Sequence, residues 1–147
     1  MWRSKESGEL YTDEQVREII DKLPKRVILL SGPTACGKTR LVKNVKAEGK
    51  RVISAETMHD AVLYIAGSDN GDFVEGMMSA FSFHPLLCVE DADLIFSGRE
   101  YTATAVESFI GEYIKAHTAV FTGLRFSDRA FTECRRNGTL VEFEYEA

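Results

Sequence analysis

The residues Gly32-Pro33-Thr34-Ala35-Cys36-Gly37-Lys38-Thr39 match the pattern G-x-x-x-x-G-K-[ST] in full. In such a loop the glycines let several backbone N–H groups turn toward one anion. Lys38 adds a positive charge for the outer phosphates of a nucleoside triphosphate, and Thr39 adds a hydroxyl ligand for Mg²⁺. The motif therefore predicts a site for ATP or ADP with Mg²⁺, and we include Arg40, the next residue, among its cofactor-binding residues.

Two acidic residues, Glu90 and Asp91, directly follow the apolar segment 86–89. A carboxylate at the end of a buried strand completes sites of this kind, because it holds the water shell of Mg²⁺. We expect Glu90 to share the metal with Thr39, and Asp91 to act catalytically by orienting or deprotonating the attacking water. The alternative is a solvated loop, since acidic residues are common where strands end.

Two further catalytic candidates lie later in the chain. Thr122 ends the apolar segment 119–122, where a short polar side chain can sense the γ-phosphate or position water. Arg136 belongs to a late group of arginines, and an Arg presented to a neighbouring subunit's nucleotide stabilises charge in the transition state. The alternatives are an ordinary strand end for Thr122 and a solvated charged face for Arg136.

Apolar segments alternate with helical patterns, and together they must position these residues. A helix starts at Thr12, where Gln15 completes a capping box, and it ends before Pro24. We then expect five strands, at 26–31, 51–55, 86–89, 119–122 and 139–145, and between them helices at 38–47, 56–65, 73–81, 102–116 and 128–136, with a turn at 68–71. Strands that alternate with helices form a parallel sheet covered on both faces. The expected fold class is therefore α/β, a P-loop NTPase three-layer αβα sandwich with a five-stranded parallel sheet.

The composition limits the domain organisation and the partners. The 147 residues fit one domain, and we expect residues 1–11 to form a flexible leader and residues 12–147 to form a single nucleotide-binding domain. A net charge of −5 does not favour a sequence-independent grip on nucleic-acid phosphate, so direct DNA binding should be weak or absent. No apolar run reaches the roughly 18 residues that cross a bilayer. We therefore expect a cytoplasmic protein with no membrane contact.

These segments together resemble the ATPase core of the bacterial replication initiator DnaA and its relatives, the Hda regulators and the DnaC-type helicase loaders of the AAA+ class. The resemblance covers about residues 25–145. Besides the phosphate-binding loop, it rests on 51–58, which is similar to the family's second strand and turn, on 85–95, which is similar to its Walker B segment, and on 119–128, which is similar to its sensor I segment.

The resemblance also implies roles for particular residues. It places Thr122 in the sensor I role and Arg135 or Arg136 near the arginine finger. Glu90, however, stands where the family usually has Asp, and neither the helical lid nor the helix-turn-helix domain follows the last expected strand. Residues 12–147 are then expected to be one AAA+ domain that binds more loosely than a complete initiator or borrows groups from a partner.

The leading hypothesis is an AAA+ core that binds ATP and Mg²⁺, has weak ATPase activity, and acts in or regulates DNA replication through a protein partner or a homo-oligomer. One alternative is an AAA+ module that binds nucleotide without significant turnover, because of Glu90 and the absent lid. Another is a P-loop kinase or transferase, because the loop also resembles that of the tRNA isopentenyl transferases. The chain is short for that transferase family.

Overall fold

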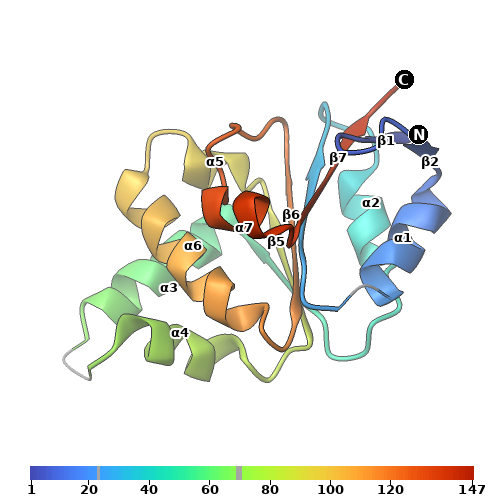
Figure 1. The fold of residues 1–147 in the computed structure, drawn as a ribbon. Helices are drawn as coiled ribbons and strands as arrows, with labels where there is room; N and C mark the ends of the chain where they lie inside the picture. The colour runs from blue at the N-terminus through green and yellow to red at the C-terminus, as the bar shows by residue number, and fades with distance from the viewer. Residues whose placement is uncertain (23, 69–70) are drawn as a thin grey trace.

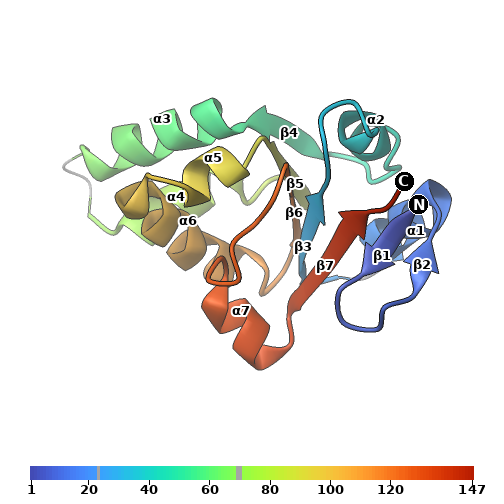
Figure 2. The same ribbon diagram turned by 90° about the horizontal axis from the view of Figure 1, so that it is seen from above.

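A single sheet runs through the centre of the molecule, with helices on both of its faces (Figures 1 and 2). The structure is a computed structural model, and it describes residues 1–22, 24–68 and 71–147. Leu23, expected in the first helix, and Asp69 and Asn70, expected in the turn at 68–71, lie outside the described residues.

Five strands of the sheet run parallel in the order β7-β3-β6-β5-β4. They are β3 (Val27–Ser31), β4 (Arg51–Ser54), β5 (Leu86–Glu90), β6 (Thr118–Gly123) and β7 (Leu140–Tyr145). Each begins and ends within one residue of a predicted strand. Strands β3, β5 and β6 are almost entirely buried, as their continuous apolar sequences require in a sheet that is covered on both faces.

The prediction of a five-stranded, wholly parallel sheet is wrong, because the sheet has seven strands within residues 1–22, 24–68 and 71–147. The N-terminal residues add β1 (Trp2–Ser4), which pairs antiparallel with β7, and β2 (Leu10–Tyr11), which pairs antiparallel with β1. Residues 2–4 and 10–11 therefore pair in the sheet, where the sequence indicated a flexible leader. Strands of three and two residues are too short to show the alternation by which a strand is recognised.

Trp2 is the side chain that fixes these N-terminal strands. Its ring is fully buried and packs edge-on against Tyr145 of β7, with the ring centroids 5.5 Å apart. The indole Nε1–H donates a hydrogen bond to Asp13 Oδ1 at 2.7 Å, so the polar part of the ring is also satisfied. A buried, hydrogen-bonded Trp thus joins the N-terminus to β7 and to the first helix.

The helices divide into two layers, each with its own core. On one face lie α1 (Asp13–Lys22) and α2 (Lys38–Lys43), and on the other lie α3 (Ala55–Ala66), α4 (Phe73–Phe81), α5 (Asp93–Phe96), α6 (Glu100–Tyr113) and α7 (Thr132–Asn137) (Figure 1). The αβα layering is therefore as predicted. None of the helices in the described residues is both long and apolar enough to cross a bilayer.

The ends of the helices show where local sequence decides and where distant contacts do. The capping box of α1 is confirmed, since Thr12 N–H donates to Gln15 Oε1 at 2.8 Å and Gln15 N–H donates to Thr12 Oγ1 at 3.1 Å. The second helix stops at Lys43, short of the expected residue 47, and Lys50 Nζ donates to the carbonyls at its end. The four-residue helix α5 was not predicted.

Replacing Trp2 by Ala should lower the free energy of unfolding by about 3–5 kcal/mol, because loss of a fully buried aromatic ring leaves a cavity. Urea unfolding followed by far-UV circular dichroism measures this change. Trp2→Phe should have a smaller effect, since it keeps most of the packing. The control is Tyr64→Ala, whose ring is 81% exposed and whose loss should change stability by less than about 0.5 kcal/mol. Equal stability of the two Ala variants would contradict the docked N-terminus.

Candidate functional site

The motif loop, residues 32–39, joins the end of β3 to the start of α2, at the carboxyl edge of the parallel strands (Figure 2). This edge is where open α/β sheets bind their ligands. The N–H of Gly32 donates to the carbonyl of Gly123 at 3.1 Å, which ties the start of the loop to the end of β6. The loop therefore begins from a fixed point in the sheet.

Both motif glycines are needed for the shape of this loop. A Cβ on Gly32 would lie 2.7 Å from Tyr145 Cβ and 2.8 Å from Cys36 Sγ, so no larger residue fits there without displacement. Gly37 has φ +103°, a left-handed conformation that disfavours L side chains. Ala35, between them, also has a positive φ, of 65°. The loop is thus bent back on itself.

The side chain of Lys38 folds over the loop that precedes it. Its Nζ donates to the carbonyl oxygens of Gly32 and Pro33, the second at 2.9 Å. This places a positive charge at the loop, where an incoming phosphate would meet it. The predicted phosphate contact of Lys38 therefore requires only that the ammonium exchange carbonyl partners for phosphate oxygens.

Glu90 and Thr122 lie side by side on the sheet face that carries α2. Strands β5 and β6 pair in register as far as Val89 and Phe121, so Glu90 and Thr122 occupy the next position on each strand. Side chains alternate along a strand, and those two residues earlier on both strands pack in the core beneath α1 and α2. Glu90 and Thr122 therefore point to the same side as α2, whose first residues are Lys38 and Thr39.

One carboxylate oxygen of Glu90, Oε1, is buried and has no hydrogen-bond partner among the described residues. Such an atom has lost its hydration without compensation, which is unfavourable. A Mg²⁺ ion with its water shell would supply the missing interaction, and Mg²⁺ takes few protein ligands besides nucleotide phosphates and water. No group of three acidic, His or Cys side chains within the described ranges forms a metal cage. The residues present fit a Mg²⁺ ion shared with a nucleotide.

The loop opens onto a cavity of about 520 Å³ that also contains Asp91. Asp91 leaves β5 with φ 56°, a conformation uncommon outside glycine and frequent at functional sites. The cavity is lined by Thr34, Ala35, Gly37, Lys38, Thr39, Arg40, Lys43, Asp91 and Leu124. The structure thus brings together most of the predicted cofactor-binding residues and one predicted catalytic residue.

Arg136 is not brought to this cavity. It lies on α7, on the opposite face of the sheet from α2, and its side chain is 72% exposed and paired with Glu133 at 3.2 Å. Arg136 therefore does not reach the loop of its own chain in this structure. Its catalytic role stays a prediction that concerns a neighbouring copy.

Asp93 is a residue of the site that the sequence analysis did not single out. Its Oδ2 accepts the N–H of Leu124 at 3.2 Å, and a Cβ on Gly123 would lie 2.7 Å from its Oδ1. Asp93 thereby holds the segment that follows β6 beside the cavity. Its position as the third acidic residue of the segment Glu90-Asp91-Ala92-Asp93 was the signal available in the sequence.

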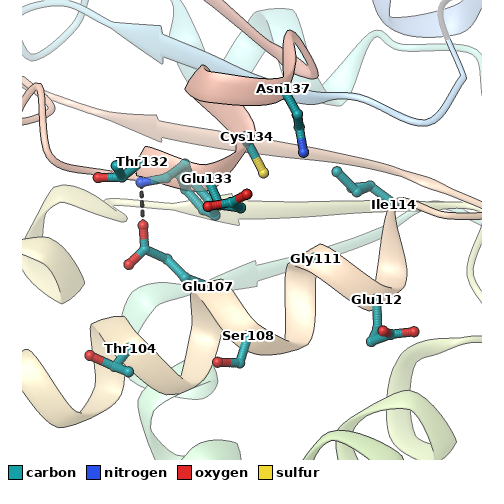
Figure 3. A pocket seen from close by; sticks show the side chains of 11 residues that line it. Thr104, Glu107, Ser108, Gly111, Glu112, Ile114, Thr132, Glu133, Cys134 and Asn137 are labelled. Atoms are coloured by element: carbon teal, nitrogen blue, oxygen red, sulfur yellow. Dashed lines mark hydrogen bonds between the residues drawn. The ribbon is translucent and has the colours of Figure 1, made fainter.

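A second cavity, of about 570 Å³, lies between α6 and α7 (Figure 3). Glutamates 107, 112 and 133 line it, and no Lys or Arg is among its lining residues within the described part of the chain. Glu107 points toward the start of α7 and accepts the backbone N–H of Phe131, whose φ is 54°. This bond explains why α7 begins at Thr132 and not near 128 as predicted. This cavity is slightly larger than the one at the loop, but its lining residues in the described part of the chain give it no positive side chain to attract phosphate.

Replacing Gly32 by Ala should lower the free energy of unfolding by about 1–3 kcal/mol, because the new Cβ overlaps Tyr145 and Cys36. Gly111→Ala is the matched control. Gly111 lies within α6 with nothing near its Cβ position, and Ala should raise stability there by up to about 1 kcal/mol. Urea titrations of both variants measure the two changes. Opposite signs are expected, and a neutral Gly32→Ala would contradict the close approach.

Burial raises the pKa of the Glu107 carboxyl above its ordinary value, although backbone N–H groups of Phe131 and Thr132 oppose the shift. The folded chain therefore keeps a proton that the unfolded chain releases, so stability should fall as pH rises from near 4.5 through the raised pKa. Glu107→Gln should remove this part of the pH dependence in urea titrations at several pH values. Glu112→Gln, an exposed change on the same helix, should retain it. An unchanged slope in Glu107→Gln would refute the assignment.

Several solved structures of replication initiators share this architecture. Domain III of the replication initiation protein DnaA from Thermotoga maritima is 17% identical, with a TM-score of 0.67, over 89% of this chain and 60% of that one. AMPPCP-bound DnaA from Aquifex aeolicus is 22% identical, with a TM-score of 0.60, over 88% of this chain and 44% of that one. A replication initiator DnaA bound to AMPPCP and single-stranded DNA is 19% identical, with a TM-score of 0.57, over 91% and 44%.

The likeness concerns a part of each initiator, since this chain spans between 44% and 60% of their lengths. No protein-family model and no curated protein matches the sequence. The resemblance inferred from the sequence motifs is confirmed at the level of the fold. The chain therefore has the fold of domain III of the Thermotoga maritima replication initiation protein DnaA.

Proposed function

We propose that the chain binds ATP or ADP with Mg²⁺ through the loop at 32–39, and that it acts in or regulates DNA replication through contacts with a partner protein or with further copies of itself. The observation that carries the proposal is the loop itself: two glycines allow its sharp bend, and the ammonium of Lys38 lies against its carbonyls. The initiators of the same fold that were solved with AMPPCP support it.

Each residue then has a role that follows from its place. The backbone of the loop surrounds the phosphates, and Lys38 neutralises charge on them. Thr39 and Glu90 would hold Mg²⁺, which when bound stabilises the negative charge of the transferred phosphoryl group. Asp91, in the cavity, orients or deprotonates the attacking water. Thr122 lies on β6, next to Glu90 of β5, and senses the γ-phosphate or positions water.

Slow hydrolysis follows from two features of the site. Glu90 carries one more methylene than Asp, so its carboxylate reaches further than the usual metal ligand of the family. Arg136 lies on the face opposite α2, so the charge of an arginine finger must come from a neighbouring copy. An isolated chain should therefore bind nucleotide but release phosphate slowly, and a module without turnover is the second candidate.

The charge of this chain favours contacts with proteins over sequence-independent DNA binding. The net charge of −5 provides no long-range attraction for phosphate. The initiator fold also supports a replication role over the kinase or transferase alternative. We therefore propose that nucleotide binding governs how the module contacts its partner.

Lys38→Ala should weaken ATP and ADP binding by about 10- to 100-fold, because a charge-assisted contact with phosphate is lost. Isothermal titration calorimetry with and without Mg²⁺ measures the affinities. The control is Lys115→Ala, an exposed change just after the end of α6 that should leave both affinities as they are. Wild type and Lys38→Ala with the same affinity would overturn the proposed site.

Asp91→Asn should keep nucleotide affinity and lower phosphate release by about 100-fold or more, because the catalytic carboxylate is removed. Phosphate release is followed in the same samples as the calorimetry. Binding by wild type without any release would favour the module without turnover. Binding of neither ATP nor ADP would refute both forms of the proposal.

A further inference from the structure

Trp2 touches a residue that packs on the first glycine of the phosphate-binding loop. Its ring lies edge-on against Tyr145, which is also its partner in the pairing of β1 with β7. Tyr145 Cβ in turn occupies the space into which a Cβ on Gly32 would project, 2.7 Å from it. The buried Trp2 ring therefore holds Tyr145 in place, and Tyr145 packs against the first residue of the loop.

A second set of contacts leads from Trp2 to the other glycine of the loop. The indole N–H donates to Asp13 Oδ1 at 2.7 Å, and Asp13 Oδ2 lies 3.9 Å from Arg40 Nη2. The same guanidinium covers Gly37, since a Cβ there would lie 3.2 Å from Arg40 Nη2. Asp13 thus connects the N-terminal strand to Arg40, directly after the loop.

The energetic basis of the two connections differs. The Asp13–Arg40 pair is exposed, so it contributes little to the stability of the fold. Its effect is to position the Arg40 guanidinium. The packing of Trp2 is fully buried and supplies the binding energy that keeps β1 in place. Surface pairs, such as Arg3 with Glu146, fix the same strand without contacting the loop.

We propose that the N-terminal strand β1 positions the nucleotide site, with Trp2 and Asp13 as positioning residues that hold the loop glycines and Arg40 in the arrangement that binds phosphate. This inference rests on the proposed function. By linkage, a docked strand strengthens nucleotide binding and bound nucleotide strengthens docking by the same factor. Strand β1 has only three residues, so few backbone hydrogen bonds hold it in the sheet (Figure 2). Bound nucleotide therefore needs to stabilise only this short strand.

The chain itself contains the reporter for this coupling. Trp2 is its single Trp, so the intrinsic fluorescence excited at indole wavelengths comes from the docked strand. Nucleotide binding at the loop should therefore change the Trp2 emission. A purely structural role for Trp2 would not produce a response that saturates with nucleotide.

The test uses the full chain and ADP with Mg²⁺. Asp13→Asn keeps an oxygen for the indole N–H but removes the carboxylate that faces Arg40, and Trp2→Phe keeps an aromatic ring but removes the donor. Each should raise the ADP dissociation constant by about fivefold or more. The double variant should bind no worse than the weaker-binding single variant, because both substitutions interrupt the same connection from Trp2 through Asp13 to Arg40. Arg3→Ala, on the same strand, should stay within twofold of wild type.

Urea titrations of every variant separate affinity from stability, and the Trp2 emission of wild type, Asp13→Asn and Arg3→Ala is recorded during the ADP titration. Wild type and Arg3→Ala should respond to ADP, and Asp13→Asn should respond less. Wild-type affinity in both Asp13→Asn and Trp2→Phe, or reduced stability with unchanged affinity, overturns the positioning role while the proposed function stands. Failure of wild type to bind ADP overturns the proposed function and this coupling together.

Discussion

The close contact between Gly32 and Tyr145 is the constraint on which the site depends. It requires β7 to lie next to β3, and it leaves room only for a glycine at the first position of the loop. The loop must then turn back within a few residues, which the left-handed conformation of Gly37 permits. Lys38 consequently lies against the loop's own carbonyls.

The two faces of the sheet differ in what they carry. The face with α3 to α7 holds the larger apolar core, and within the described residues no member of the 32–39 loop belongs to it. The face with α1 and α2 carries the loop, Glu90 and Thr122 at the carboxyl ends of three adjacent strands. Parallel strands bring these ends together, so residues from distant parts of the sequence meet at one edge. The cavity between α6 and α7 is larger than the one at the loop, and its residue Glu107 fixes the start of α7.

The sequence predicted strands β3, β5 and β6 well because each is a nearly continuous apolar run, and β7 because its apolar and polar residues alternate. It predicted the loop because the motif is complete. It did not predict β1 and β2, since their pairing depends on a Trp buried by distant partners. The end of α2 depends on Lys50, which lies beyond the helix, and the start of α7 depends on Glu107, which lies on α6. The unpartnered oxygen of Glu90 likewise follows from burial and not from any local pattern.

A crystal structure of the chain with AMPPCP and Mg²⁺ tests the central claim most directly. The account predicts electron density for the phosphates within the loop, with the Lys38 ammonium moved from the carbonyls of Gly32 and Pro33 to phosphate oxygens. It also predicts a metal ion near Thr39 and Glu90. Nucleotide bound elsewhere, for instance between α6 and α7, with Lys38 still bonded to the loop carbonyls, would contradict it.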